Sequence, residues 1–208
     1  MMRIKGNYVE RNLVKYINED FTLKEAYDFL ILTGYRCIPV LDKKEEKFIG
    51  NIYKVHILEY EKQNNLNEKV TKLVTDSDVS IFENSSFFEL FFSIKKFPYI
   101  AVLNDEKIFL GILTHAKVLE LLQDSWGLSK GGFALTLATS DYVGTLARIS
   151  KIVNKYTSIQ SLITLDNEHL FVRRVVVTLP KDVSEDKLEF ISSDLENHGL
   201  RVVHIESL

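Results

Sequence analysis

The chain has 208 residues, of which 46% are hydrophobic and 26% are charged, and its formal net charge is −3. This balance is typical of a globular protein with one or two domains, and it argues against charge-driven binding to nucleic acid or to a membrane surface. The first residues contain no signal-peptide core, and no stretch of the sequence is apolar for long enough to span a membrane. The single cysteine excludes an internal disulfide. We therefore expect a cytoplasmic protein.

The first 120 residues contain one pattern twice. An apolar run at 38–41 returns sixty-two positions later at 100–103. Each copy then closes with a glycine that follows an apolar residue, in Ile49-Gly50-Asn51-Ile52 and in Leu110-Gly111-Ile112-Leu113. A repeat of this length predicts two units that bury their apolar faces against each other, with a cleft between them. That cleft is the expected place for a function.

The first copy is expected to fold as strand, helix, strand, strand, helix. Thr22 followed by Glu25 is typical of a capping box, which predicts a helix from Leu23, and Gly34 suits the C-terminal cap. The next predicted elements are strands over Cys37–Leu41 and Phe48–Tyr53 and a helix from Lys54 to about Gln63.

In the second copy, Asn84 is expected to cap a helix. The predicted elements are a helix over Phe87–Lys95, strands over Tyr99–Leu103 and Ile108–Leu113, and a helix over His115–Leu122.

A polar, glycine-containing stretch at 123–132 separates the repeat from a different pattern. The order there is strand, helix, strand, strand, helix, strand, which predicts an antiparallel sheet with both helices on one face. The predicted elements are strands over Phe133–Thr139, Ile159–Leu165, Leu170–Leu179 and Leu200–Ile205 and helices over Tyr142–Tyr156 and Ser184–His198, with a turn at 166–168 and a helix end at Gly199.

A few short segments carry a resemblance to known families. In the repeat they are residues 22–26, 34–42 and 48–50 of the first copy and 98–102 and 111–114 of the second. The repeated unit resembles a CBS domain, and the two copies resemble a CBS tandem, or Bateman-type pair. Residues 141–149, Asp-Tyr-Val-Gly-Thr-Leu-Ala-Arg-Ile, resemble the start of an ACT domain.

These resemblances imply a fold of the α/β (α+β) class: tandem CBS modules that form a Bateman-type pair, followed by a ferredoxin-like βαββαβ ACT-like domain. The expected boundaries are 1–63 for the first CBS module, 64–124 for the second, 125–132 for a linker and 133–208 for the ACT-like domain. The order CBS–CBS–ACT is similar to that of small regulatory proteins of Gram-positive bacteria, some of which bind cyclic di-AMP.

The resemblance also implies an adenosine-containing ligand in the cleft between the modules. In the family, a Gly-x-x-Thr-x-x-Asp segment supplies a threonine for phosphate and an aspartate for the ribose diol. The second copy keeps the threonine as Thr114 and has Lys117 in place of the aspartate. The first copy has Tyr53 and His56 at these two positions.

The loss of both aspartates bears on the choice of ligand. AMP and ATP have a free 2′,3′ diol, whereas a 3′,5′-linked cyclic dinucleotide has none and carries two phosphodiester charges. Arg36 and Lys117 suit such an anion, and Tyr35, Phe97 and Tyr99 offer aromatic faces for adenine. Cyclic di-AMP is therefore the expected ligand.

The candidate ligand-binding residues are Thr22, Tyr35, Arg36, Cys37, Ile38, Pro39, Phe97, Tyr99, Ile100, Thr114 and Lys117. We expect no catalytic residues, no cofactor and no metal site, because the histidines lie on separate elements without ligand-like spacing. The expected partners are a second copy of the chain and a regulated protein. A constitutive dimeric interaction module with vacant CBS sites and an AMP or ATP sensor are alternatives.

Overall fold

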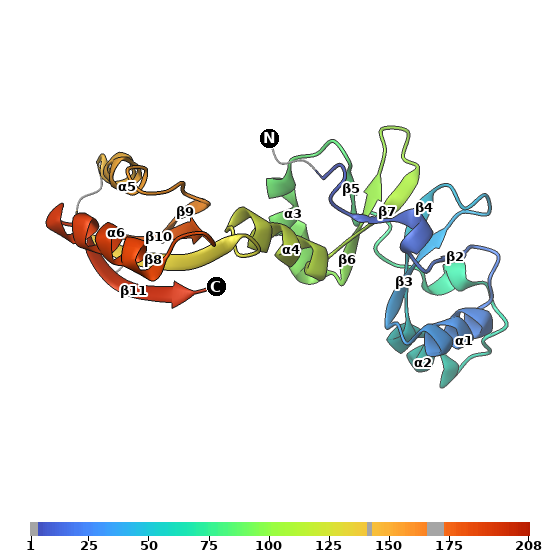
Figure 1. The fold of residues 1–208 in the computed structure, drawn as a ribbon. Helices are drawn as coiled ribbons and strands as arrows, with labels where there is room; N and C mark the ends of the chain where they lie inside the picture. The colour runs from blue at the N-terminus through green and yellow to red at the C-terminus, as the bar shows by residue number, and fades with distance from the viewer. Residues whose placement is uncertain (1–3, 141–142, 166–172) are drawn as a thin grey trace. The chain divides into compact units, whose positions relative to one another are not determined.

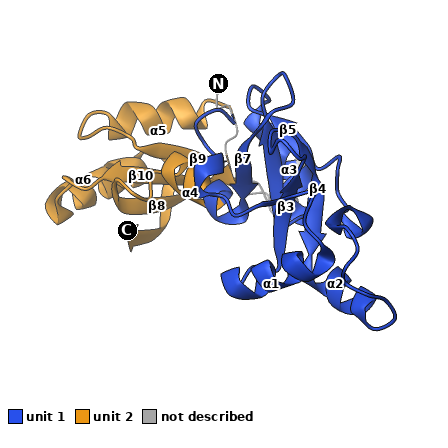
Figure 2. Cartoon of the chain, turned by 90° about the vertical axis from the view of Figure 1, so that its right-hand side faces the viewer, with its two compact units in different colours: residues 1–118 blue, residues 119–208 orange. Residues whose placement is uncertain are grey.

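The computed structural model describes residues 4–140, 143–165 and 173–208 (Figure 1). The chain divides into two compact units, residues 1–118 and 119–208 (Figure 2). The turn predicted at 166–168 and the residues Asp141 and Tyr142 of the ACT-like segment lie outside the described residues.

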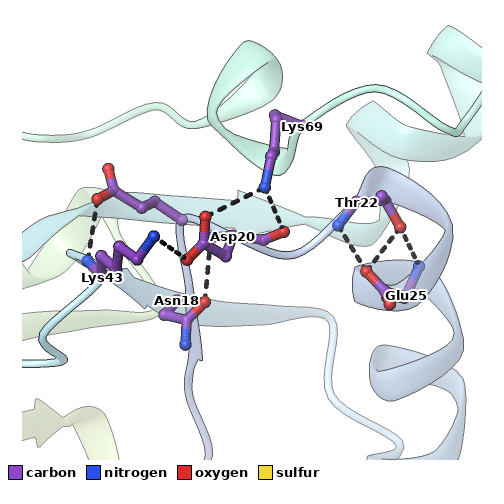
Figure 3. A network of polar contacts seen from close by, with 7 residues as sticks. Asn18, Asp20, Thr22, Glu25, Lys43 and Lys69 are labelled. Atoms are coloured by element: carbon purple, nitrogen blue, oxygen red, sulfur yellow. Dashed lines mark hydrogen bonds and ion pairs between the residues drawn. The ribbon is translucent and has the colours of Figure 1, made fainter.

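The first copy of the repeat has the predicted order of elements. These are β2 (Ile17–Asn18), α1 (Leu23–Thr33), β3 (Cys37–Leu41), β4 (Phe48–Tyr53) and α2 (Lys54–Glu61). The predicted capping box starts α1, since the Thr22 hydroxyl accepts from the Glu25 amide at 3.2 Å and the Glu25 carboxylate accepts from the Thr22 amide at 2.8 Å (Figure 3). Gly34 ends the helix with φ of 74°.

The second copy repeats this topology with β5 (Ser80–Phe82), α3 (Phe87–Ser93), β6 (Tyr99–Leu103), β7 (Phe109–Thr114) and α4 (His115–Ser125). In both copies the middle strand runs parallel to the first and antiparallel to the third. The strand register shifts at the same place in each copy, between Val40 and Leu41 and between Val102 and Leu103. The predicted repeat is confirmed.

The prediction that Asn84 caps a helix is wrong. Ser86 caps α3 instead, because its hydroxyl accepts from the Phe88 amide at 3.3 Å. The Asn84 side chain donates to a carboxylate oxygen of Asp105 at 3.3 Å, and this contact holds it away from the helix. Short polar residues two positions apart are equally good caps, and tertiary contacts decide between them.

The chain enters the repeat through an additional strand, β1 (Val9–Glu10), which pairs antiparallel with β7 of the second copy. The sheet of the second copy therefore has the order β1-β7-β6-β5, and that of the first copy has the order β2-β3-β4. The strand β1 continues into a 3-10 helix, η1 (Arg11–Leu13). Two further 3-10 helices are η2 (Val70–Leu73) and η3 (Ile94–Lys96).

The two copies face each other through equivalent residues. Phe48 and Phe109 hold the same place in their copies, and their rings stack with centroids 6.2 Å apart and an interplanar angle of 18°. Lys47 and Ile108, one residue earlier in each copy, form an antiparallel bridge. Contacts between equivalent positions require an approximate two-fold axis between the copies. A shared core of Val14, Leu41, Ala101, Leu103 and Phe109 lies beside this axis.

An ion-pair cluster fixes the loop between β2 and α1 (Figure 3). The Lys69 ammonium donates to the backbone oxygen of Asp20 at 2.7 Å and to its carboxylate at 3.2 Å, and the Lys43 ammonium lies 3.5 Å from the same carboxylate. The hydrogen bond from Lys69 is the main reason that the pKa of Asp20 lies below its ordinary value. The cluster therefore holds residues 18–22 at the carboxyl end of β2.

The second unit is a four-stranded antiparallel sheet with the order β11-β8-β10-β9, as the βαββαβ pattern predicts. Its elements are β8 (Gly131–Thr139), α5 (Thr145–Val153), β9 (Ser161–Leu165), β10 (Arg173–Pro180), α6 (Glu185–Asn197) and β11 (Arg201–Ser207). Leu137 and Val177 of the sheet share one core with Ile149 of α5 and Ile191 of α6, so both helices cover the same face. This arrangement is ferredoxin-like.

Candidate ligand-binding cleft

A cavity of about 460 Å³ lies in the first unit where β3 and β6 begin. Its volume falls in the range of roughly 300–1,000 Å³ that is common for small-molecule sites. The cavity brings together seven of the residues predicted from the sequence, namely Tyr35, Arg36, Cys37, Ile38, Pro39, Tyr99 and Thr114.

The other four predicted residues are not among those that line this cavity. Thr22 lies in the capping box beyond the carboxyl end of β2, whereas the cavity is at the amino end of β3, which runs parallel to β2. Ile100 is 1% exposed within β6, and Phe97 follows η3. The Lys117 amide donates to the Thr114 hydroxyl at 3.2 Å, which places Lys117 on the first turn of α4.

One wall of the cavity was not predicted from the sequence. It comes from the segment of β1 and η1 and includes Val9, Leu13, Val14 and Lys15. The pairing of β1 with β7 holds this segment beside Thr114. A two-residue strand leaves no periodic signal in a sequence, so the pattern of apolar residues gives no indication of this wall.

A buried hydrogen-bond chain leads away from the cavity, starting at Tyr99 and Cys37 of its lining. The Tyr99 hydroxyl donates to the Asn51 side-chain oxygen at 2.7 Å, and it lies 3.6 Å from the Cys37 sulfur. The Asn51 side-chain nitrogen lies 3.4 Å from the Asp76 carboxylate, which also accepts from the Tyr53 hydroxyl at 2.6 Å. Asn51 is fully buried, and these contacts satisfy both ends of its amide.

The Cys37 thiol and the hydroxyls of Tyr53 and Tyr99 in this hydrogen-bond chain have pKa values above their ordinary ones. Burial raises the pKa of the Cys37 thiol to about 11. Burial is also the main reason that the pKa of Tyr99 and the pKa of Tyr53 lie above their ordinary values, with the Asp76 hydrogen bond adding to the shift of Tyr53. At neutral pH these three side chains are uncharged, which suits contact with an uncharged planar group.

Cationic side chains stand at the rim. Arg36 and Lys15 both line the cavity and are exposed. Among residues 4–140, 143–165 and 173–208, none forms a hydrogen bond or an ion pair with either cationic group. The rim can therefore attract an anion without first breaking an internal contact.

A second cavity, of about 510 Å³, adjoins the first. It is lined by Arg36, Cys37, Tyr53, Lys54, Val55, Leu58 and Pro98, of which Arg36, Cys37 and Pro98 also line the first cavity. Tyr53 pairs with Cys37 across the first sheet as Thr114 pairs with Tyr99 across the second. The second cavity is thus the counterpart of the first across the approximate two-fold axis.

A third hollow, of about 720 Å³, is wide open and follows the N-terminal segment from Tyr8 to Tyr16. Its lining contains none of the residues predicted to bind a ligand. We therefore take the first two cavities as the candidate site.

The family model of the CBS domain matches residues 6–62. These residues form a CBS domain. The second copy has the same topology, and the first unit as a whole has the fold of a CBS pair. None of the curated protein sequences matches the chain.

Several solved structures are similar to this chain. A CBS domain-containing protein of unknown function from Bacillus anthracis is 26% identical, over 59% of this chain and 94% of that protein, with a TM-score of 0.52. CbpB of Listeria monocytogenes, solved in complex with c-di-AMP, is 22% identical over 56% of this chain and 91% of that one, with a TM-score of 0.50. A CBS domain pair/ACT domain protein of Thermotoga maritima is 20% identical over 58% and 96%, with a TM-score of 0.50. These likenesses show the shared fold.

In the described part of the chain, no three or more His, Cys, Asp or Glu side chains gather in a way that could hold a metal ion. Within that same part, no helix combines the length and the apolar character that crossing a membrane requires.

Proposed function

We propose that this chain is a cytoplasmic regulatory protein that binds an adenine nucleotide, with cyclic di-AMP as its preferred ligand, in the cleft of its CBS pair. The observation that carries the proposal is a CBS-pair cavity lined by the aromatic residues Tyr35 and Tyr99 and by exposed cations at Arg36 and Lys15. An uncharged base suits the aromatic part of the lining, and phosphate suits the cations. The fold shared with CbpB, which was solved with c-di-AMP, supports this choice.

The absence of carboxylates from the cavity lining favours a cyclic dinucleotide over AMP or ATP. Within the described residues, no Asp or Glu lines the first or the second cavity. A free ribose diol is best bound by a carboxylate that accepts hydrogen bonds from both hydroxyls. The two positions at which the family has this aspartate are occupied here by Lys117 and His56. A ligand with two phosphodiesters and no free diol loses nothing from this change.

Binding would act by shifting an equilibrium between forms of a homodimer. The ligand contacts both copies of the repeat, through Arg36 and Tyr99, so it can stabilise one relative placement of the copies over another. A partner protein that distinguishes these forms would sense the ligand, and the effect would be reciprocal. We propose this binding role in place of catalysis.

Calorimetric titration of the purified protein with cyclic di-AMP, AMP, ATP and NAD tests the ligand. We expect cyclic di-AMP to bind most tightly. Tighter binding of AMP or ATP would establish the nucleotide-sensor alternative. If none of the four ligands binds, the chain is an interaction module with vacant sites, and the proposal fails.

Substitution of Arg36 tests the site. A charge-assisted hydrogen bond contributes about 1.5–3 kcal/mol, so Arg36→Ala should weaken cyclic di-AMP binding by roughly ten- to more than a hundredfold. Because Arg36 is exposed, the melting temperature without ligand should change little. Lys44→Ala, in the exposed turn between β3 and β4, is the matched control and should alter neither quantity. Lys117→Ala tests the other predicted cation, and affinity within twofold for both Arg36→Ala and Lys117→Ala would place the phosphates elsewhere.

A further inference from the structure

The two adjoining cavities have the geometry of one site. We propose that a single cyclic dinucleotide spans both of them, with one base in each cavity and its phosphates beside Arg36 in the middle. This inference rests on the proposed function and adds to it the number of ligands per chain and the placement of the ligand.

The shared lining is the first argument. Arg36, Cys37 and Pro98 belong to both cavities, so the two cavities adjoin at these three residues. Arg36 and Pro98 are exposed, and Cys37 is buried with 9% of its surface accessible. A ligand that reaches from one cavity to the other therefore passes over Cys37 and beside Arg36.

Symmetry is the second argument. Cys37 and Tyr99 begin the central strands of the two copies, and they touch each other across the approximate two-fold axis at 3.6 Å. Phe48 and Phe109 meet on the same axis. A cyclic dinucleotide with identical bases is itself two-fold symmetric, with its phosphates in the central ring and its bases at the ends. Placed with its axis on that of the repeat, it offers each cavity the same group.

The distribution of charge is the third argument. Of the two cavities, the first alone has Lys15 in its lining and the second alone has Lys54, whereas Arg36 lines both. The walls beyond these cations are largely apolar, with Ile112 in the first cavity and Val55 in the second. Anionic groups are thus favoured near the centre of the joint site, and planar apolar groups are favoured at its two ends.

A substitution in each cavity separates one joint site from two independent sites. Val55 is 52% exposed in the second cavity and Leu13 is 71% exposed in the first, so a larger side chain at either place fills the cavity from its surface. Val55→Trp and Leu13→Trp are titrated with cyclic di-AMP by calorimetry. Glu61→Trp, which adds the same ring to α2 outside the cavity lining, is the control.

We expect one cyclic di-AMP per chain in the unsubstituted protein. Val55→Trp and Leu13→Trp should each weaken its binding at least tenfold, and Glu61→Trp should leave the affinity within twofold. Two ligands per chain, or a loss confined to one of the two variants, would overturn the joint site while leaving the proposed function intact. Failure of the unsubstituted protein to bind cyclic di-AMP would instead overturn the proposed function. If a tryptophan variant does not fold, Lys54→Glu and Lys15→Glu replace the pair and are judged by the same criterion.

Discussion

Single side chains in the cleft show what a sequence reveals about a buried site and what it does not. Cys37 is buried, as its place in an apolar run predicts. Asn51 stands between Gly50 and Ile52 in a strand that is expected to be buried. A buried amide without partners costs about 1–3 kcal/mol, so a side chain at this place needs a hydrogen-bond partner. The sequence could not name that partner, because Tyr99 is 48 residues away and reaches Asn51 only after the two copies pack.

The reactivity of Cys37 follows from its burial. At pH 8, a rise in the thiol pKa from 9.0 to about 11 lowers the thiolate fraction by about 100-fold, and the thiolate is the form that reacts. Iodoacetamide should therefore modify native Cys37 at least that much more slowly than an exposed cysteine, and the rate should rise as the pH approaches 11. The double variant Cys37→Ala, Lys44→Cys provides the exposed control. Equal rates for the two proteins at pH 8 would contradict the burial of the thiol.

The same shift sets the sign of a pH effect on stability. The folded-state pKa of Cys37 lies above the unfolded value, so folding favours the protonated thiol. Its contribution to the free energy of unfolding is fully present below about pH 9 and is lost as the pH rises through about 11.

At the scale of elements, the accuracy of the prediction depends on how local the signal is. The capping box at Thr22 and the helix end at Gly34 are determined by neighbouring residues, and both are confirmed. Asn84 and Ser86 compete for the same cap, and the contact of Asn84 with Asp105 decides the outcome. The short strand β1 owes its conformation to β7, which is about a hundred residues later, so no local pattern predicts it.

Gly111 makes the approach of β1 possible, and its replacement should be costly. A Cβ atom at Gly111 would lie inside the contact distance of the Val9 backbone oxygen, and the residue has φ of 155°. Gly111→Ala should therefore destabilise the first unit and displace the β1 wall of the cavity, as measured by chemical denaturation and by ligand affinity.

Gly199→Ala separates steric crowding from backbone strain. Gly199 has φ of 77°, and nothing lies within 4 Å of the position that a Cβ would take, so only the left-handed backbone opposes alanine there. That strain costs about 1–2 kcal/mol. A loss of stability in Gly111→Ala no larger than in Gly199→Ala would show that β1 is not held closely against β7.

At the scale of the whole chain, the sequence predicts the repeat and the different domain after it, because each pattern extends over many residues. The period of the repeat predicted two modules that face each other, and the pattern of the C-terminal part predicted the order of its strands. The pairing of equivalent residues across an axis, such as Phe48 with Phe109, depends on the docking of finished modules and has no signal in either copy alone. The two adjoining cavities of the proposed joint site also exist only because the modules dock in this way.

We expect the chain to form a homodimer in solution. The helices α1 and α3 hold equivalent places in the two copies, and each leaves a large apolar side chain in solvent, Leu32 with 84% exposed and Phe88 with 72%. The two side chains lie at opposite ends of their helices, Leu32 near the end of α1 and Phe88 near the start of α3. Large apolar side chains in solvent favour self-association through the helices that carry them. Light scattering should give twice the chain mass of 24.0 kDa, or about 48 kDa, at micromolar concentration.

Leu32→Glu should shift the protein toward monomer, because it places a charge where an apolar contact is expected. Phe190→Glu, at a position 66% exposed on α6 of the other unit, is the control and should leave the mass unchanged. A mass near 24 kDa for the unsubstituted protein, with and without cyclic di-AMP, would mean that a single chain carries the regulatory response.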